Sequence, residues 1–172
     1  MSAAFQNELH VLVVDEDYAV VRNVCGRLLA HGYEVATWRH ARGLRETIVR
    51  TQPDLVLVDV LMPNFNGVEL KTLLAQYPSS GTPAIILHSA VPSRALCRMI
   101  DVRNALGVIE KTSDDVEFLL AFDTVVDRYL SRRPGASPRP IRAMSGTHRI
   151  QDETEPTLPD NVVLWTGDTR RR

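Results

Sequence analysis

The chain has 172 residues, 44% of them hydrophobic and 24% charged, which is typical of one globular domain with some additional length. Its longest apolar runs, such as 118–122, are about five residues long, whereas a helix needs roughly 18 to 20 to span a bilayer. Residues 1–8 lack the basic and apolar segments of a secretory signal, so we expect a cytoplasmic protein. The net charge is −1, but residues 1–130 contain 16 acidic and 12 basic residues and residues 131–172 contain 5 and 8, so the two parts differ.

Residues 9–130 alternate between short β-branched apolar runs and segments whose apolar residues recur every three or four positions. The apolar runs predict five strands, at 10–14, 34–38, 55–59, 84–88 and 108–110. The periodic segments predict five helices, at 17–31, 40–51, 67–77, 93–104 and 114–130. Gly32 should end the first helix and Ser113 should cap the last.

Helical periodicity also predicts which side chains face the core. The expected inward-facing set includes Val49, Val68, Val116, Leu119, Leu120, Val126 and Leu130. Cys25 and Cys97 lie in apolar helical patterns, outside any cluster with zinc-ligand spacing, so we expect two buried, reduced thiols.

Five strand–helix units predict an α/β fold, a doubly wound, five-stranded parallel sheet in the flavodoxin-like order 2-1-3-4-5 with helices on both faces. Strand 34–38 alternates in polarity, as expected at a sheet edge. Ligands of such sheets bind beyond the carboxyl ends of the central strands. We therefore expect the functional residues to lie there.

The predicted strand ends carry charged and polar residues. Asp15 and Glu16 follow the first strand, Asp59 ends the third, Ser89 follows the fourth and Lys111 follows the fifth. Two carboxylates about 4 Å apart repel by about 4 kcal/mol at an effective dielectric of 20 and therefore need a cation. Oxygen ligands suit Mg²⁺, and with a lysine and a hydroxyl they suit a phosphoryl group. The sequence predicts a phosphoryl site.

These motifs resemble those of response-regulator receiver domains of two-component signalling, the CheY-like superfamily. The matching segments are VLVVDED at 11–17, LVDVLMP at 57–63 with Gly67, Ser89-Ala90, and Lys111. The spacings of 44, 30 and 22 residues between Asp15, Asp59, Ser89 and Lys111 are also typical of the family. The resemblance covers about residues 8–130.

The resemblance implies that Asp59 accepts a phosphoryl group from a histidine kinase or a histidine phosphotransfer protein. Lys111 would pair with the phosphorylated Asp59, and Ser89 would hydrogen-bond a phosphoryl oxygen. The implied Mg²⁺ ligands are Asp15, Glu16, Asp59 and the backbone carbonyl of Leu61. The protein would not be an ordinary enzyme, although it would catalyse its own phosphoryl transfer and dephosphorylation.

The implied output is protein contact in two-component signalling or a phosphorelay, without direct DNA binding or membrane association. The resemblance allows a homodimer through the face formed by the fourth helix, fifth strand and fifth helix. Two residues depart from the family pattern there. Val108 replaces an aromatic residue, and Thr112 replaces the proline after the lysine, so a trans bond is expected after Lys111.

The sequence divides into a lead at 1–8, a receiver domain at 9–130 and a tail at 131–172. The tail is rich in Arg, Pro, Ser and Gly, which predicts a mainly disordered segment without an output domain. Its apolar cluster at 162–165 could be a solvated patch, add a strand to a partner, or pack back on the domain.

Two alternatives remain open. A haloacid-dehalogenase-like phosphatase would use Asp15 and Asp17, but Ala19 departs from that motif and no later acidic pair ends an apolar strand. A receiver-like scaffold that is never phosphorylated would act through contacts alone. A hydrolase using His88 and Ser89 is excluded, because neighbours on a strand point to opposite faces.

Overall fold

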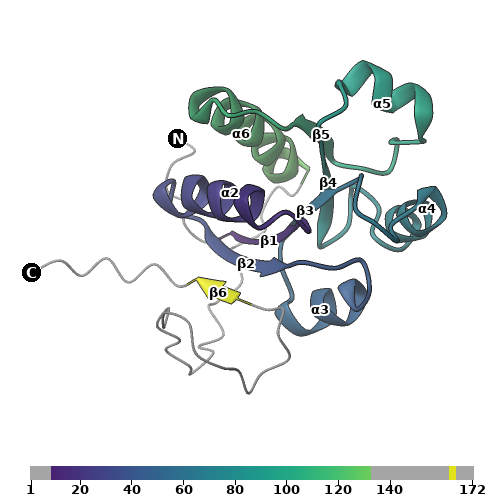
Figure 1. The fold of residues 1–172 in the computed structure, drawn as a ribbon, viewed down its shortest axis with the longest axis horizontal. Helices are drawn as coiled ribbons and strands as arrows, with labels where there is room; N and C mark the ends of the chain where they lie inside the picture. Colours follow the sequence, from purple (N-terminus) through teal and green to yellow (C-terminus); the bar gives the residue numbers. More distant parts are fainter. Residues whose placement is uncertain (1–8, 133–162, 166–172) are drawn as a thin grey trace, which may run out of the picture.

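A computed structural model of the chain describes residues 9–132 and the backbone of residues 163–165. Strands and helices alternate from β1 to α6, and a short strand, β6, follows (Figure 1). The strands are β1 (His10–Val14), β2 (Glu34–Trp38), β3 (Leu55–Asp59), β4 (Ala84–Ser89), β5 (Gly107–Glu110) and β6 (Val163–Trp165). The helices are α2 (Tyr18–Ala30), α3 (Leu44–Thr51), α4 (Gly67–Gln76), α5 (Ser93–Met99) and α6 (Asp115–Ser131).

The sheet has the order β5-β4-β3-β1-β2-β6, with β1 to β5 parallel. This confirms the predicted doubly wound fold and the strand order 2-1-3-4-5. β6 adds an antiparallel sixth strand, with Val163 opposite Thr37 and Trp165 opposite Val35. Of the three alternatives for the apolar cluster at 162–165, the structure has the one in which the cluster packs back on the domain, through residues 163–165. Residues 131 and 132 complete α6 and its cap, and residues 133–162 and 166–172 lie outside the described part of the chain.

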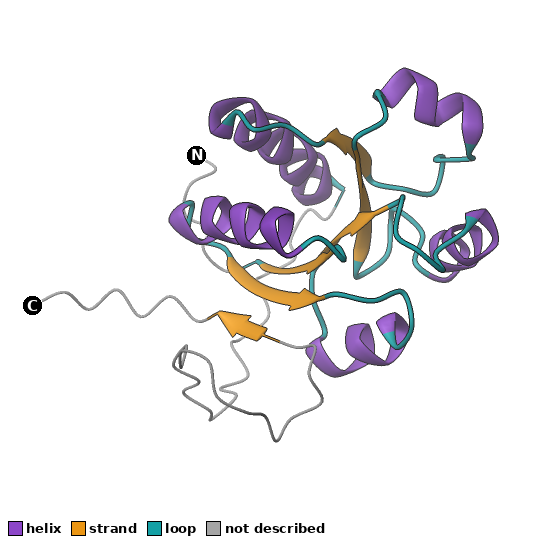
Figure 2. Ribbon diagram, viewed as in Figure 1, coloured by secondary structure: helices purple, strands orange, loops and turns teal. Residues whose placement is uncertain are grey.

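Helices cover both faces of the sheet (Figure 2). α2 and α6 pack on one face, where Leu28, Phe118 and Phe122 are fully buried against the strands. α3, α4 and α5 pack on the other, where Leu12 and Val56 contribute to a second cluster. Because both faces are covered, every residue of β3 and β4 is buried, which fixes the strand ends that carry the site.

The packing of α6 on β5 depends on a glycine. A Cβ at Gly107 would lie 2.8 Å from Cγ2 of Val125, closer than side-chain carbons approach one another. The absence of a side chain at this position therefore lets α6 lie directly against β5, the strand that leads to Lys111.

Several helix boundaries differ from the predictions, most of them by one residue, and the differences at α3, α5 and the start of α6 have structural content. α3 begins at Leu44 instead of 40, because Gly43 has a φ of 77° that does not belong to a helix. α5 ends at Met99 instead of 104. α6 is capped by Asp114, which accepts a bond from the Glu117 amide at 2.9 Å, and not by Ser113.

Several residues predicted to face the core are exposed. The exposed fractions are 67% for Val49, 72% for Val68, 67% for Val116 and 63% for Leu120. α6 instead buries Phe118 and Phe122, whose larger apolar surface decides which side of the helix faces the sheet. Cys25 is buried as predicted, but Cys97 is exposed on α5.

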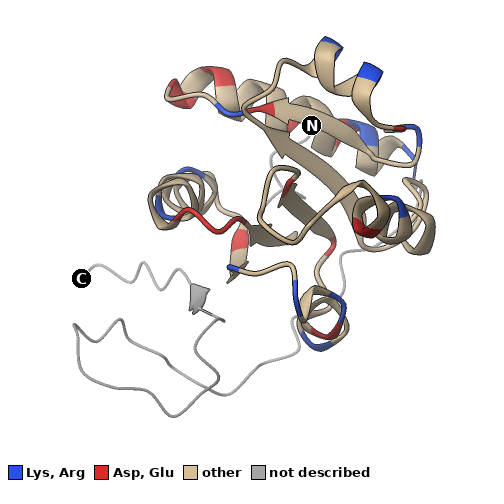
Figure 3. Cartoon of the chain, turned by 45° about the vertical axis from the view of Figure 1, so that its right-hand side comes forward, with Lys and Arg blue, Asp and Glu red and all other residues tan. Residues whose placement is uncertain are grey.

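In Figure 3, positions with Lys or Arg and positions with Asp or Glu both occur along several helices and loops of the cartoon. Within the part of the chain that the structure describes, no helix has the length and apolar character needed to cross a membrane.

The β6–β2 pairing can be tested by removing one backbone donor. Proline lacks an N–H group and fits poorly in a paired strand, so Leu164→Pro should release β6. We expect faster hydrogen exchange at residues 35–37, measured by mass spectrometry, with α4 unchanged. Leu158→Pro, outside β6, is the control. Equal exchange in the wild type and Leu164→Pro would contradict the pairing.

Candidate functional site

Three side chains meet at the carboxyl ends of the parallel strands. Asp15 follows β1, Asp59 ends β3, and Lys111 follows β5. The Lys111 ammonium lies 2.7 Å from Oδ2 of Asp15 and 3.0 Å from Oδ2 of Asp59. The sheet thus brings together three of the five residues that sequence analysis placed at these ends, and one cation bridges two carboxylates.

Only one of the two carboxylate oxygens of Asp15 accepts a hydrogen bond from the backbone of the described residues. Its Oδ1 accepts a hydrogen bond from the Asp17 amide at 2.9 Å, and its own amide donates to the Trp38 carbonyl at the end of β2. Oδ2 is fully buried and has no hydrogen-bond partner among the described residues, although the Lys111 ammonium lies beside it without hydrogen-bonding geometry. Burial raises the pKa of Asp15, and the contacts with Lys111 and the Asp17 amide only partly offset this.

The two carboxylate oxygens of Asp59 have different partners. Oδ1 accepts a hydrogen bond from the Leu61 amide at 3.0 Å, and Oδ2 lies against Lys111. The backbone immediately after it is fixed by a bond from the Val60 amide to the His88 carbonyl. The Asp59 side chain is 9% exposed, so the carboxylate is positioned at the surface of the sheet end with some access to solvent.

Lys111 is positioned by the neighbouring strand. Its amide donates to the Ser89 carbonyl at 2.8 Å, and its side chain turns back across the ends of β3 and β1. Burial lowers the pKa of the Lys111 amine, but the contacts with Asp15 and Asp59 outweigh this effect and the pKa is raised. The ammonium therefore stays charged at neutral pH.

Ser89, the fourth predicted residue, lies fully buried at the end of β4. Its Oγ accepts a hydrogen bond from the Val91 amide at 3.0 Å, which shapes the loop that leads into α5. Ser93 at the start of α5 is in turn joined to β5 through a bond from its amide to Glu110. Ser89 thus connects the site to the segment between β4 and α5.

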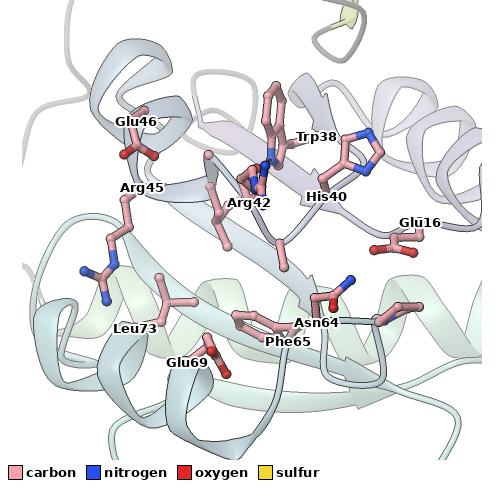
Figure 4. Close-up of a pocket in the computed structure, with 14 residues that line it drawn as sticks. Glu16, Trp38, His40, Arg42, Arg45, Glu46, Asn64, Phe65, Glu69 and Leu73 are labelled. Carbon is pink, nitrogen blue, oxygen red and sulfur yellow. Dashed lines mark hydrogen bonds between the residues drawn. The ribbon is translucent and has the colours of Figure 1, made fainter.

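Glu16 does not join the carboxylates of Asp15 and Asp59. It lines a pocket of about 930 Å³ between the β2–α3 loop and α4, which Trp38 and Phe65 also line (Figure 4). Within residues 9–132, no group of three or more Asp, Glu, His or Cys side chains is close enough to hold a metal ion.

The two carboxylates that do meet, those of Asp15 and Asp59, nevertheless suit Mg²⁺ as ligands. This ion takes one or two carboxylates, keeps several waters and favours oxygen ligands. Asp15 and Asp59 supply two carboxylates, and Oδ2 of Asp15, which is buried and accepts no hydrogen bond among the described residues, is an oxygen that a divalent cation would satisfy.

Two arginines near the site were missed by sequence analysis. Arg39 donates to the Glu16 carbonyl at 3.1 Å and lies over the Tyr18 ring. Arg27, on α2, donates to the segment that follows Lys111. Neither has a local motif, because each bond joins residues far apart in the chain.

Both departures from the family pattern can be located. Val108 is half-buried and packs against the cluster beneath α3, α4 and α5. The bond from Lys111 to Thr112 is trans, as predicted, and the cis peptide bond within residues 9–132 joins Thr82 to Pro83.

His88 and Ser89 do not form a catalytic pair. The His88 ring contacts the Phe118 ring edge-on at 6.0 Å, on the α2–α6 side of the sheet. Burial, with the charges of Lys111 and Arg27, lowers the pKa of His88 to about 3, so the ring is a neutral core residue.

Comparison with known proteins identifies the family. The model of the response regulator receiver domain matches residues 11–123, so the chain belongs to this family. Response regulator PleD of Caulobacter vibrioides is 29% identical over 142 residues, which cover 79% of this chain and 31% of PleD. The sensory/regulatory protein RpfC of Xanthomonas campestris is 28% identical over 131 residues, covering 74% of this chain and 18% of RpfC. The chain thus spans less than a third of the length of these relatives.

Solved structures show the same fold. A response regulator receiver protein from Burkholderia phymatum has a TM-score of 0.57 and 26% identity, covering 69% of this chain and 95% of that one. Response regulator TrrA of Thermotoga maritima, solved with Mg²⁺ and BeF, has a TM-score of 0.58 and 21% identity, covering 68% and 98%.

The phosphatase alternative is wrong. The chain belongs to the receiver family, and the Asp17 side chain, which that alternative needs in the site, instead caps α2 by accepting from the Ala19 amide at 2.8 Å.

Neutralising Asp15 should stabilise the fold. Because burial raises the pKa of Asp15, its ionised form costs folding free energy at pH 7, and the cost appears as the pH rises through the raised value. We expect Asp15→Asn to increase the free energy of unfolding by about 0.5 to 2 kcal/mol, the range common for removing a functional strain. Urea denaturation with EDTA measures this. Asp17→Asn, which retains a good helix cap, should change little. Lower stability of Asp15→Asn would mean that the contact with Lys111 outweighs burial.

His88 should make stability depend on pH. Its pKa is about 3 in the folded state and near 6.5 when unfolded, so the unfolded chain binds more protons between these values and stability falls as the pH falls. His88 alone should contribute a loss of about 2 kcal/mol between pH 7 and pH 5. Urea denaturation at both pH values should show this loss reduced by that amount in His88→Leu. The same pH dependence in both proteins would contradict it.

Proposed function

We propose that the protein is a phosphoacceptor of a two-component system or phosphorelay, with Asp59 as the acceptor. The observation that supports this most directly is the position of the Asp59 carboxylate. Oδ1 accepts a hydrogen bond from the Leu61 amide, and Oδ2 faces the Lys111 ammonium. The residue ends a strand that is fully buried. A carboxylate held in this way is a suitable nucleophile for phosphoryl transfer.

In the proposed reaction, an Asp59 oxygen forms a bond to the phosphorus of a phosphohistidine. The P–N bond breaks, its electron pair leaves with the imidazole, and the imidazole takes up a proton. Lys111 lies where negative charge on the phosphoryl group would be balanced, since it already faces an oxygen of Asp59. The donor would be a histidine kinase or a histidine phosphotransfer protein, and we place the reaction in the cytoplasm.

Asp15, Glu16, Asp59 and the Leu61 carbonyl are the proposed Mg²⁺ ligands. The bound ion would supply positive charge against the phosphoryl oxygens. Glu16, which lines the neighbouring pocket, would have to turn towards Asp15 or act through a bound water.

The phosphorylated state would be sensed through Ser89. Its hydroxyl is engaged with the Val91 amide, so a new bond from Ser89 to a phosphoryl oxygen would change the loop before α5. The output would be contact with a downstream protein or a second copy on the α5–β5–α6 face. Val108, in the place of an aromatic ring, makes a ring movement in β5 impossible, so the loop carries more of the response.

Phosphorylation can be tested without the partner kinase. Incubation with acetyl phosphate and Mg²⁺ should add one phosphoryl group to the intact protein, detected by mass spectrometry. Asp59→Asn should lose the addition, because it lacks the nucleophile, and so should the wild type with EDTA. Asp17→Asn should retain it, since Asp17 caps α2.

Absence of labelling in the wild type, under conditions where another receiver domain is labelled and where a set of histidine kinases also fails, would contradict the proposal. The protein would then be a receiver-like scaffold that acts through contacts alone.

A further inference from the structure

The segment after Lys111 is fastened by a side chain from another helix. Arg27, in the last turn of α2, donates from Nη1 to the Thr112 carbonyl at 2.9 Å and from Nη2 to the Ser113 carbonyl at 3.0 Å. Its Nε lies 2.6 Å from Oδ1 of Asp115, the first residue of α6. One guanidinium thus contacts three of the four residues 112–115, which follow Lys111 and include the first residue of α6.

This guanidinium is itself held in place. The Arg27 side chain is 10% exposed, and its Cζ lies 5.3 Å from the centre of the Phe118 ring. Phe118 is fully buried and contacts the His88 ring, and His88 pairs with Asp59 in the sheet. Arg27 therefore lies on a packed layer directly beneath the strand ends.

The contacts depend on the shape of the arginine side chain as well as on its positive charge. A guanidinium presents five donors in a rigid plane, so it can bind two successive carbonyls and a carboxylate together. Lysine would supply a similar charge at one point and could not reproduce this pattern. Without the guanidinium, the partly buried Thr112 carbonyl would lose its partner.

Lys111 depends on this segment for its position. Its amide is fixed to Ser89 on one side, and the next residue on the other side is Thr112. Within the segment, the Asp114 amide donates to Oγ1 of Thr112, so its residues move together. Displacement of Thr112 would shift the Lys111 backbone and draw its ammonium away from Asp15 and Asp59.

We propose that Arg27 is a positioning residue for the phosphoryl site, which holds residues 112–115 and thereby keeps the Lys111 ammonium on the two carboxylates. The same helix begins at the Asp17 cap beside Asp15, so α2 connects the acidic end of the site to the segment that positions the lysine. The part of this inference that concerns phosphoryl transfer rests on the proposed function.

The first arm of the test does not depend on phosphorylation. Hydrogen exchange of residues 111–117 is measured by mass spectrometry in the wild type, Arg27→Gln and Arg27→Lys. Arg22→Gln is the matched control, because Arg22 is an exposed residue of α2 in the same groove between α2 and α6. We expect faster exchange in both Arg27 variants and wild-type exchange in the control. Unchanged exchange in the Arg27 variants would overturn the proposal.

The second arm measures the rate of labelling by acetyl phosphate with saturating Mg²⁺. A displaced positioning group should lower the maximal rate in Arg27→Gln by about tenfold to a hundredfold. If Arg27 acts through Lys111, the double variant Arg27→Gln/Lys111→Met should be labelled at nearly the same rate as Lys111→Met alone. An independent loss in that background, or wild-type labelling by Arg27→Gln, would overturn the positioning role.

The arms separate the two proposals. If the wild type is not labelled but exchange rises in the Arg27 variants, the proposed function fails and the holding of residues 112–115 stands. If Arg27→Gln does not fold, Arg27→Lys, which keeps the charge, decides the outcome in both arms.

Discussion

The site depends on one ammonium placed between two carboxylates. Lys111 is 2.7 Å from Asp15 and 3.0 Å from Asp59, and these two acids lie at the ends of adjacent strands, which fixes their separation. Their mutual repulsion and the burial of Asp15 both oppose the ionised state, and the lysine offsets only part of this. Groups whose pKa is shifted in this way are common at functional sites, and the residual cost agrees with the Mg²⁺ binding proposed above.

The rest of the domain serves to hold this arrangement. β3 and β4 are buried on both faces, so Asp59 and Ser89 extend from rigid strands, whereas Lys111 follows the short strand β5. Gly107 allows α6 to lie against that strand, and Arg27 fastens the chain after it. The position of the lysine thus depends on side-chain contacts more than the positions of the acids do.

The sequence was sufficient to predict the strand order and the three residues that meet, because both follow from local patterns and from the geometry of parallel sheets. It was wrong for Val68, Val116 and Leu120, since apolar spacing does not say which of two adjoining helix faces is buried. Arg27 and Arg39 could not be predicted, because their partners lie far away in sequence and the backbone carbonyls that they bind carry no residue-specific signal. The prediction that Glu16 is a metal ligand remains a proposal.

β6 covers the outer edge of β2, which would otherwise be an edge of the sheet. Without it, β2 would present unpaired backbone groups along its outer side, and an open edge of this kind is a template for pairing with another chain. Antiparallel pairing with Val163–Trp165 satisfies part of that edge from within the molecule. The short strand β5, at the opposite end of the order, is then the other edge of the described sheet. Residues 163–165 therefore protect this edge against pairing with another chain, and we expect a protein that lacks β6 to lose solubility at high concentration before it loses its fold.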